Sequence, residues 1–243
     1  MKGIILAAGV ASRLRPLTND TPKCLLTVGD KPILQRTIES LLLNSINDLV
    51  IVTGYLNKKI ENFIADNFPE INVEFIYNER YDSTNNIYSL WMTKQAVIGE
   101  DVILLDSDIV FDSRVLKLVV DSKFDNCLAV KSTEKLSDEE IKVTLNSDNS
   151  ISEISKEVEI NAAVGESVGI EKFSAEFVDR LFNLLDKMII DEKLDNIFYE
   201  AAFQRLINNG AKIYQVSTGE LKCLEVDFPE DFKKAAEEVK FMQ

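Results

Sequence analysis

Histidine is absent from this 243-residue sequence. Without imidazole the chain cannot build a Ser-His-Asp or Cys-His triad, a histidine-ligated metal site or an imidazole general base. Cysteine is scarce, since Cys24, Cys127 and Cys223 are the only three and stand far apart. Their spacing matches no zinc site, so we expect three buried, reduced thiols that behave as small hydrophobes. Any chemistry must therefore depend on carboxylates, cations and a bound metal ion.

Long apolar runs are also missing, because no run approaches the roughly 18 residues that a membrane-spanning helix needs. The first twenty residues lack the pattern of a signal peptide, since Gly9, Ser12, Arg13 and Arg15 interrupt the apolar segment. We therefore expect a cytoplasmic protein without a membrane partner.

Basic residues are outnumbered, with 27 Lys and Arg against 41 Asp and Glu and a net charge of −14. Nucleic-acid binding requires a basic face, so this balance argues against a nucleic-acid partner. Residues 1–24 are the exception, since four cations there oppose one acid. A small basic patch on an acidic protein suits a small phosphorylated ligand.

The first two dozen residues have the composition of a phosphate-binding loop. An apolar segment at 2–7 predicts a buried strand, and it leads into the small residues Ala7, Ala8 and Gly9. Backbone N–H groups can approach an anion only where side chains are absent or small. A Walker loop and a dinucleotide fingerprint are both excluded, because the required glycines and the Gly-Lys-Ser/Thr sequence are missing. A tight turn between core elements is the alternative.

The order Leu-Ala-Ala-Gly, Ser-Arg-Leu-x-Pro-Leu-Thr, Pro-Lys resembles the nucleotidyltransferase (pyrophosphorylase) family. This resemblance implies a Rossmann-like three-layer α/β/α fold with a mixed, mostly parallel central sheet, of the nucleotide-diphospho-sugar transferase type. Ala11 stands where the family usually has glycine, at a cost of about 1 kcal/mol if its backbone is left-handed. The residues implied to bind nucleotide here are Leu6, Ala7, Ala8, Gly9, Arg13 and Lys23.

Periodicity in the first half of the chain predicts strands that alternate with helices, and hence βαβ units with a parallel sheet. Lys31-Pro32 is expected to open a helix, with Pro32 at a first-turn position, and Ser83 or Thr84 can cap a helix that runs to about Val97. The other expected elements are strands at 2–7, 49–53, 73–77 and 102–105 and a helix at 57–67.

After residue 125 the pattern changes to short strands without intervening helices, which predicts an antiparallel patch or mixed edge. We expect one domain at 1–243, with 1–125 mainly binding nucleotide and 126–243 mainly binding the acceptor. The expected elements are strands at 128–131, 142–145, 151–154, 164–171, 212–216 and 222–226 and helices at 174–190, 196–208 and 229–240.

Two carboxylates follow the strand at 102–105. Alternation along an extended chain places Asp106 and Asp108 on one side, where both can converge on Mg²⁺. A solvated turn or helix cap is the alternative. The family resemblance implies that Asp108 binds the metal ion and that Asp106 lies at the nucleotide.

A second acidic segment, Cys223 to Asp227 followed by Pro229-Glu230-Asp231, resembles the family's near-terminal segment. The resemblance implies that Asp227 is the second Mg²⁺ ligand. Phe228 stands where a hydroxyl cap is usual, so Asp227 as a mere helix cap remains the alternative.

The stretch from Tyr77 to Trp91, with 140–143 and 165–170, resembles the branch that includes CTP:phosphocholine cytidylyltransferase. This implies transfer of CMP from CTP to phosphocholine, giving CDP-choline and pyrophosphate. Thr84 and Asn85 would lie near the base. Arg13, Lys23 and Lys156 would be catalytic, with Lys156 on the acceptor phosphate; a plain surface lysine is the alternative.

Aromatic faces and carboxylates recognise ammonium groups. A helix stripe that contains Trp91 is equally typical of core packing. The residues predicted to bind the acceptor are Tyr88, Trp91, Lys156, Glu166, Tyr199 and Glu200.

Other hypotheses remain open from the sequence. The acceptor can be 2-aminoethylphosphonate or a sugar-1-phosphate, since the scaffold fixes the reaction better than the substrate. A glycosyltransferase would use Asp106-x-Asp108 to hold a nucleotide sugar, but this hypothesis leaves Arg13 and Lys23 unexplained. A non-catalytic nucleotide sensor would bind nucleotide without turnover. The expected partners are small-molecule substrates, and a homodimer is allowed but not required.

Overall fold

The computed structural model describes residues 1–132 and 136–243, and its centre is a nine-stranded mixed sheet. The strand order along the main path is β10-β9-β11-β6-β1-β4-β5. The parallel part comes from the first half of the chain, and its strands are β6 (Val102–Asp106), β1 (Lys2–Ala7), β4 (Asp48–Thr53) and β5 (Asn72–Tyr77).

The second half of the chain adds the antiparallel part that the sequence predicts. The long strand β11 (Gly165–Phe173) pairs antiparallel with β6, β8 and β9 and joins the two parts. The remaining strands are β8 (Cys127–Lys131), β9 (Lys142–Leu145), β10 (Ile151–Ser155) and β12 (Tyr214–Ser217). The predicted three-layer α/β/α fold with a mixed sheet is confirmed.

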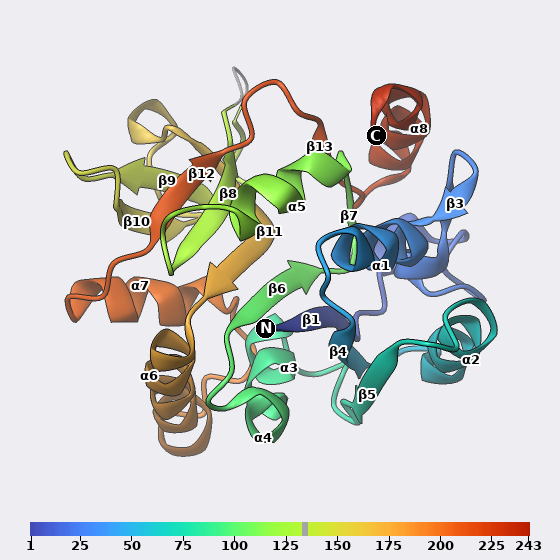
Figure 1. Cartoon of the computed structure of the whole chain (residues 1–243), viewed down its shortest axis with the longest axis horizontal. Helices are drawn as coiled ribbons and strands as arrows, with labels where there is room; N and C mark the ends of the chain where they lie inside the picture. The colour runs from blue at the N-terminus through green and yellow to red at the C-terminus, as the bar shows by residue number, and fades with distance from the viewer. Residues whose placement is uncertain (133–135) are drawn as a thin grey trace.

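Side chains that alternate between the two faces of the buried strands form a hydrophobic core on each side of the sheet. In β1, Ile4 and Leu6 face one core and Ile5 faces the other, as pleated strands require. Figure 1 shows α1 and α5 on one side of the central strands and α3, α4 and α6 on the other. The helices are α1 (Ile33–Leu43), α2 (Asn57–Asn67), α3 (Asn86–Met92), α4 (Lys94–Val97), α5 (Ser113–Val120), α6 (Ala175–Asp186) and α7 (Glu200–Asn208).

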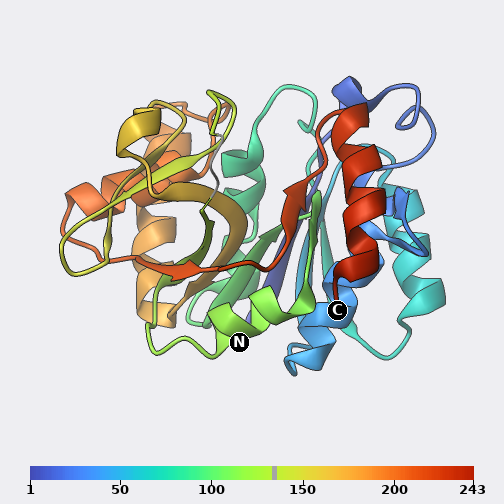
Figure 2. The ribbon, with the colours of Figure 1, turned by 90° about the horizontal axis from the view of Figure 1, so that it is seen from above.

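A third, smaller core joins the two ends of the chain. The last helix, α8 (Pro229–Glu238), packs Ala235 against Leu14 and Leu26 of the N-terminal segment and Val226. Figure 2 shows this helix lying against the N-terminal segment. The short strands β2 (Thr27–Val28) and β3 (Lys31–Pro32) belong to the same region. The loop after β1 and the segment before α8 are thereby held side by side.

Several predicted elements need correction. The cap before α3 is Asn85, whose side chain accepts the Asn86 N–H, so neither Ser83 nor Thr84 caps it. α7 begins at Glu200 and not at 196. The sequence pattern predicted neither α5 nor β7 (Ile109–Phe111). β7 is short, and its partner β13 (Cys223–Glu225) is distant in sequence.

The three cysteines are free and buried, as predicted, and burial raises the pKa of each thiol. Among the described residues, no helix combines the length and apolar character needed to cross a membrane. The division at residue 125 stays a prediction.

Candidate active site

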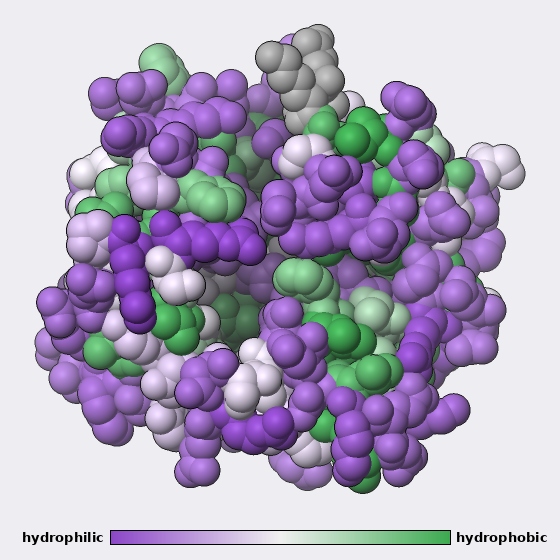
Figure 3. Space-filling model, turned by 180° about the vertical axis from the view of Figure 1, so that it is seen from behind, coloured by the Kyte–Doolittle hydropathy of each residue, from purple (hydrophilic) through white to green (hydrophobic). Residues whose placement is uncertain are grey.

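A cavity of about 890 Å³ opens beyond the carboxyl ends of β1 and β6, where ligands bind in open α/β sheets. Figure 3 shows the face of the molecule hollowed at its centre. Most of the predicted site residues line it. They are Leu6, Ala7, Ala8, Gly9, Arg13, Lys23, Thr84, Asn85, Asp106, Asp108, Lys156, Glu166, Glu200 and Asp227.

The loop after β1 has an open backbone. An added Cβ at Gly9 would meet no atom within 4 Å, so a ligand can approach the main chain there. Ala11 has φ 50° and ψ 49°, the left-handed conformation considered from the sequence, and stores about 1 kcal/mol of strain. The buried Thr18 hydroxyl donates to the Ala11 carbonyl at 2.8 Å and helps to hold this conformation.

Two cations from this segment reach the same carboxylates. The Lys23 Nζ lies 2.9 Å from Asp108 Oδ2 and also donates to Asp227. Burial alone would lower the pKa of Lys23, but Asp108 and Asp227 raise the pKa above its ordinary value. Arg13 Nη1 lies 3.3 Å from Asp227 Oδ2, and its guanidinium stacks 5.2 Å from the Phe228 ring centroid.

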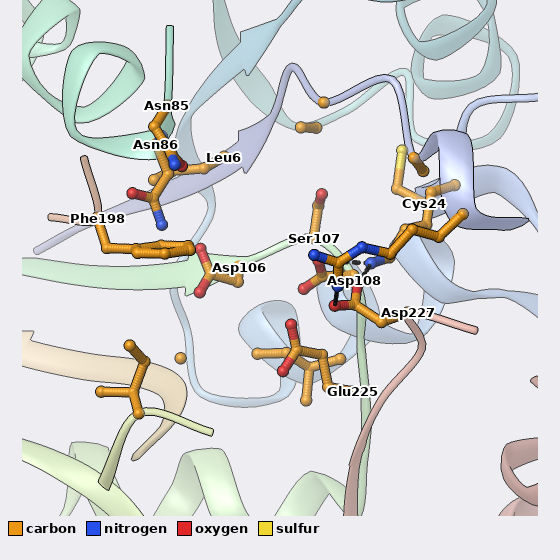
Figure 4. Close-up of a pocket in the computed structure, with 18 of the residues that line it drawn as sticks. Leu6, Cys24, Asn85, Asn86, Asp106, Ser107, Asp108, Phe198, Glu225 and Asp227 are labelled. Carbon is orange, nitrogen blue, oxygen red and sulfur yellow. Dashed lines mark hydrogen bonds and ion pairs between the residues drawn. The ribbon is translucent and has the colours of Figure 1, made fainter. Parts of the chain in front are cut away.

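Three carboxylates gather beside these cations. Asp108, Glu225 and Asp227 each offer an oxygen within 4.8 Å of the others, and Figure 4 shows them facing one another. The Asp108 Oδ1 is buried without a hydrogen-bond partner among the described residues. Desolvation in the cavity wall raises the pKa of Glu225 above its ordinary value, although its side chain is open to the cavity. The negative charges of Asp108 and Asp227 raise this pKa further. Hard oxygen ligands of this kind suit Mg²⁺.

Glu225 was missed from the sequence. It precedes Asp227 by two residues, and alternation places both on the same side of an extended segment. The pairing of β13 with β7 sets Glu225 opposite Ile109, directly after Asp108. The two-residue spacing of Glu225 and Asp227 was therefore the sequence signal that could have identified Glu225.

The expected convergence of Asp106 and Asp108 on one metal ion is wrong. Alternation ends at Asp106, because Ser107 and Asp108 form a turn between β6 and β7. Asp106 Oδ2 instead accepts a hydrogen bond of 2.9 Å from the Tyr199 hydroxyl. Burial, and then the charges of Asp108 and Glu200, raise the pKa of Asp106 well above its ordinary value. Figure 4 shows Asp106 beside Phe198, separated from the three-carboxylate group.

Asp227 does not cap the last helix. The Asp231 carboxylate accepts the N–H groups of Phe228 at 2.8 Å and of Asp227 at 3.2 Å. That arrangement satisfies the start of α8 and leaves the Asp227 side chain with Lys23 and Arg13. The structure thus removes the helix-cap alternative for Asp227.

Thr84 and Asn85 lie in the cavity wall at the start of α3. The Thr84 hydroxyl donates to the Arg80 backbone carbonyl at 2.7 Å, and the side-chain Oδ1 of Asn85 accepts the Asn86 N–H at 2.8 Å. The Asn85 amide and backbone are thereby fixed in orientation. Their contact with a base stays a prediction.

The far end of the cavity holds Lys156, Glu166 and Glu200 together with an aromatic residue that was missed, Phe198. Lys156 Nζ lies 4.8 Å from the Phe198 ring centroid. Glu166 accepts from Lys131 at 2.9 Å. Glu200 is only 5% exposed, and burial raises its pKa to about 7. The sequence signal for Phe198 was its position directly before Tyr199 and Glu200.

Three predicted acceptor residues do not line the cavity. Trp91 Nε1 donates to Asp186 of α6 at 2.9 Å, and the half-buried Tyr88 and Trp91 rings of α3 pack against each other and against the core. Tyr199 is fully buried and holds Asp106. Trp91 is thus directed toward α6 and has a packing role, whereas the Tyr88 ring centroid lies 5.0 Å from the Arg80 guanidinium.

The arrangement can hold an anionic phosphate chain at one end and a second phosphate near Lys156. Lys23 and Arg13 can offset charge on a triphosphate, and the three carboxylates can hold a divalent cation. One hydroxyl of the wall lies beside a carboxylate, since the Ser137 hydroxyl donates to Glu140 Oε2 at 2.6 Å. A site with cations for two phosphates suits a reaction whose nucleophile comes with a substrate.

Comparison with known proteins agrees with this chemistry. A family model described as nucleotidyl transferase matches residues 2–140. The CTP:phosphoglutamine cytidylyltransferase of Campylobacter jejuni subsp. jejuni serotype O:2 is 29% identical over 257 residues, covering 96% of this chain and 98% of that protein. The choline-phosphate cytidylyltransferase of Streptococcus pneumoniae is 39% identical over 107 residues, covering 44% of this chain and 45% of that protein.

Among solved structures, that of the CTP:phosphocholine cytidylyltransferase from Streptococcus pneumoniae superposes with a TM-score of 0.80. The two sequences are 24% identical, and the match covers 97% of each chain. This likeness extends to the whole fold.

Proposed function

Since this chain belongs to the nucleotidyl transferase family, we propose that it is a cytidylyltransferase, which transfers CMP from CTP to a small phosphorylated acceptor and releases pyrophosphate. Family membership establishes the class of enzyme. The choice of CTP follows the names of two relatives, both cytidylyltransferases, of which one matches 96% of this chain and the other 44%.

One observation carries the proposal: a single cavity joins the Gly9 loop, Lys23 and the three-carboxylate group to Lys156. A triphosphate fits the first three features, because backbone N–H groups and cations hold phosphate oxygens. Lys156 then provides a separate charge for the acceptor phosphate. A site for two anionic reactants needs cations at both ends, as this cavity has.

In the proposed reaction an acceptor phosphate oxygen attacks the α-phosphorus of CTP. The bond from that phosphorus to the bridging oxygen breaks, and pyrophosphate leaves. The nucleophile is already anionic, so the absence of histidine is no obstacle. Lys23 and Arg13 offset the charge that develops on the leaving group, and Lys156 orients the acceptor, so catalysis rests on positioning and electrostatics.

We further propose Mg²⁺ as the cofactor. Asp108, Glu225 and Asp227 would hold it, and the unpartnered Asp108 Oδ1 fits that role. When bound, Mg²⁺ supplies positive charge that polarises the α-phosphate and the leaving group. Lys23, paired with Asp108 and Asp227, neutralises part of the same acidic group.

For the acceptor, phosphocholine is the first candidate, because Glu166, Glu200 and the Phe198 face can receive an ammonium group. Phosphoglutamine is the second, since the relative that matches along nearly the whole chain carries that name. 2-Aminoethylphosphonate and a sugar-1-phosphate are further alternatives with the same reaction.

The test is to incubate the purified protein with Mg²⁺ and each of CTP, UTP, dTTP, ATP and GTP, crossed with phosphocholine, phosphoglutamine, phosphoethanolamine, 2-aminoethylphosphonate and glucose-1-phosphate. Pyrophosphate release is the measurement. We expect release with CTP and one or more nitrogen-bearing acceptors. Release with glucose-1-phosphate alone would keep the reaction and discard the ammonium site.

Two other outcomes would contradict the proposal. Tight nucleotide binding without pyrophosphate in any combination would support the sensor alternative, and transfer of a sugar from a nucleotide sugar would support a glycosyltransferase. Glu166→Gln refines the test: we expect a much larger rise in the acceptor KM than in the CTP KM, and equal rises would remove Glu166 from the acceptor site.

A further inference from the structure

Lys142, the first residue of β9, is a buried lysine whose ammonium lies behind the cavity wall. The residue is 1% exposed. A buried ammonium is tolerated only where its N–H groups find acceptors, because desolvation of an unpaired charge is costly. Lys142 Nζ donates to three backbone carbonyls, those of Lys156 at 2.5 Å, Ser137 at 3.2 Å and Glu140 at 3.4 Å.

These three carbonyls belong to two segments that both line the cavity. The first is 137–140, closed on itself because the Ser137 N–H and hydroxyl donate to Glu140 Oε2 at 2.7 and 2.6 Å. The second contains Lys156, one residue after β10. A surface ion pair, Lys156 Nζ to Glu139 Oε2 at 3.4 Å, also links them. Exposed pairs of this kind contribute little, so the buried ammonium is the stronger link.

We propose that Lys142 is a positioning residue for the acceptor end of the site. Its ammonium fixes the backbone of Lys156 and the 137–140 segment in one arrangement. Because the Lys156 backbone is fixed, only the side-chain torsions of Lys156 must become ordered when it binds a phosphate beside Phe198. The role assigned to Lys156 rests on the proposed function, whereas the anchoring of the two segments does not.

The register of the sheet supports this role. Lys142 pairs with Ser155 of β10 on one side and with Glu166 of β11 on the other. Its backbone is therefore held at the junction between the strand that leads to Lys156 and the strand that carries Glu166. The ammonium that binds the 137–140 segment and Lys156 therefore extends from a strand that is itself held on both sides.

Lys172 offers a matched control. It is 7% exposed, and its Nζ donates to the carbonyls of Val120 at 3.1 Å and Ser122 at 2.7 Å. Neither these residues nor Lys172 lines the cavity. Lys142→Met and Lys172→Met thus remove the same chemistry from two buried sites, of which only one borders the acceptor end.

We expect Lys142→Met to raise the acceptor KM at least tenfold and to leave the CTP KM within twofold, whereas Lys172→Met changes neither. Both variants should lower the Tm by similar amounts. Lys142→Arg keeps the charge but cannot direct three donors from one atom, so we expect an intermediate acceptor KM. The arginine variant carries the comparison if the methionine variant does not fold.

Amide hydrogen exchange gives a readout that does not depend on turnover. Exchange at 137–141 and 155–157 should be faster in Lys142→Met than in the wild type and in Lys172→Met. Unchanged exchange would overturn the proposal, and so would faster exchange with an unchanged acceptor KM. If the wild type turns over no acceptor, the proposed function fails, while the exchange comparison still decides whether Lys142 anchors the two segments.

Discussion

Lys23 and Asp227 are 204 residues apart in the sequence, yet their side chains form an ion pair in the wall of the cavity. Asp108 joins the same ammonium at 2.9 Å. The N-terminal loop, the turn after β6 and the segment before α8 therefore meet at one cation. Because this cation offsets two carboxylates, its removal should affect both charge balance and nucleotide binding.

Lys23→Met should lower kcat/KM for CTP about 100-fold or more, the scale seen when one preorganised donor is removed from developing charge. Steady-state pyrophosphate release measures this. Lys117→Met is the control, since Lys117 is exposed on α5 and, within the part of the chain that the structure describes, pairs with Asp121 alone. Wild-type kcat/KM in Lys23→Met would remove Lys23 from the triphosphate site.

Glu225→Gln should raise the Mg²⁺ concentration for half-maximal activity about tenfold or more, because one of three hard ligands becomes neutral. A Mg²⁺ titration at saturating CTP measures it, and EDTA should abolish wild-type activity reversibly. Glu230→Gln, at an exposed position in α8, is the matched variant. An unchanged Mg²⁺ requirement in Glu225→Gln would leave only Asp108 and Asp227 as ligands.

Glu200 should make stability depend on pH. Its pKa is about 7 in the folded protein, against an ordinary glutamate value of 4.5, mainly because burial disfavours the charge. Between these values the unfolded chain releases the proton first, so the free energy of unfolding falls as pH rises from about 4.5 to about 7. The loss approaches about 3 kcal/mol above pH 7.

Glu200→Gln removes this titration, so its stability advantage over the wild type should be small at pH 4.5 and largest at pH 8. Guanidinium unfolding at several pH values measures it, with the exposed Glu70→Gln as control. A difference that does not change with pH would mean that Glu200 ionises normally.

Trp91→Phe and Phe198→Ala separate packing from acceptor contact. The first removes the 2.9 Å hydrogen bond to Asp186 and should cost about 1 kcal/mol of stability, with the acceptor KM within twofold. The second removes the ring beside Lys156 and should raise the acceptor KM about tenfold. Kinetics and thermal unfolding on both variants test the assignment. A large acceptor effect in Trp91→Phe would return Trp91 to the site.

Local pattern was sufficient for much of the fold. Apolar segments of strand length predicted β1, β4, β5 and β6, and helical spacing gave 57–67 with the bounds that the structure has. Caps were less predictable, as Asn85 shows, because several adjacent residues can cap and packing selects one. The pairing of β7 with β13 was not predicted, because each strand is only three residues long and the two are far apart in the sequence.

The sequence by itself determined the parts of this protein that depend on neighbouring residues: the small-residue loop, the strand and helix periods, the absence of histidine and the excess of acid. It also provided Lys23, Asp108 and Asp227 as candidates. Only the tertiary structure decided that Glu225 joins the carboxylates, that Asp106 turns to Tyr199 and that Trp91 lies outside the cavity wall. Side-chain direction at the end of a strand depends on turns and long-range pairing, and these are set by the packing of the whole sheet.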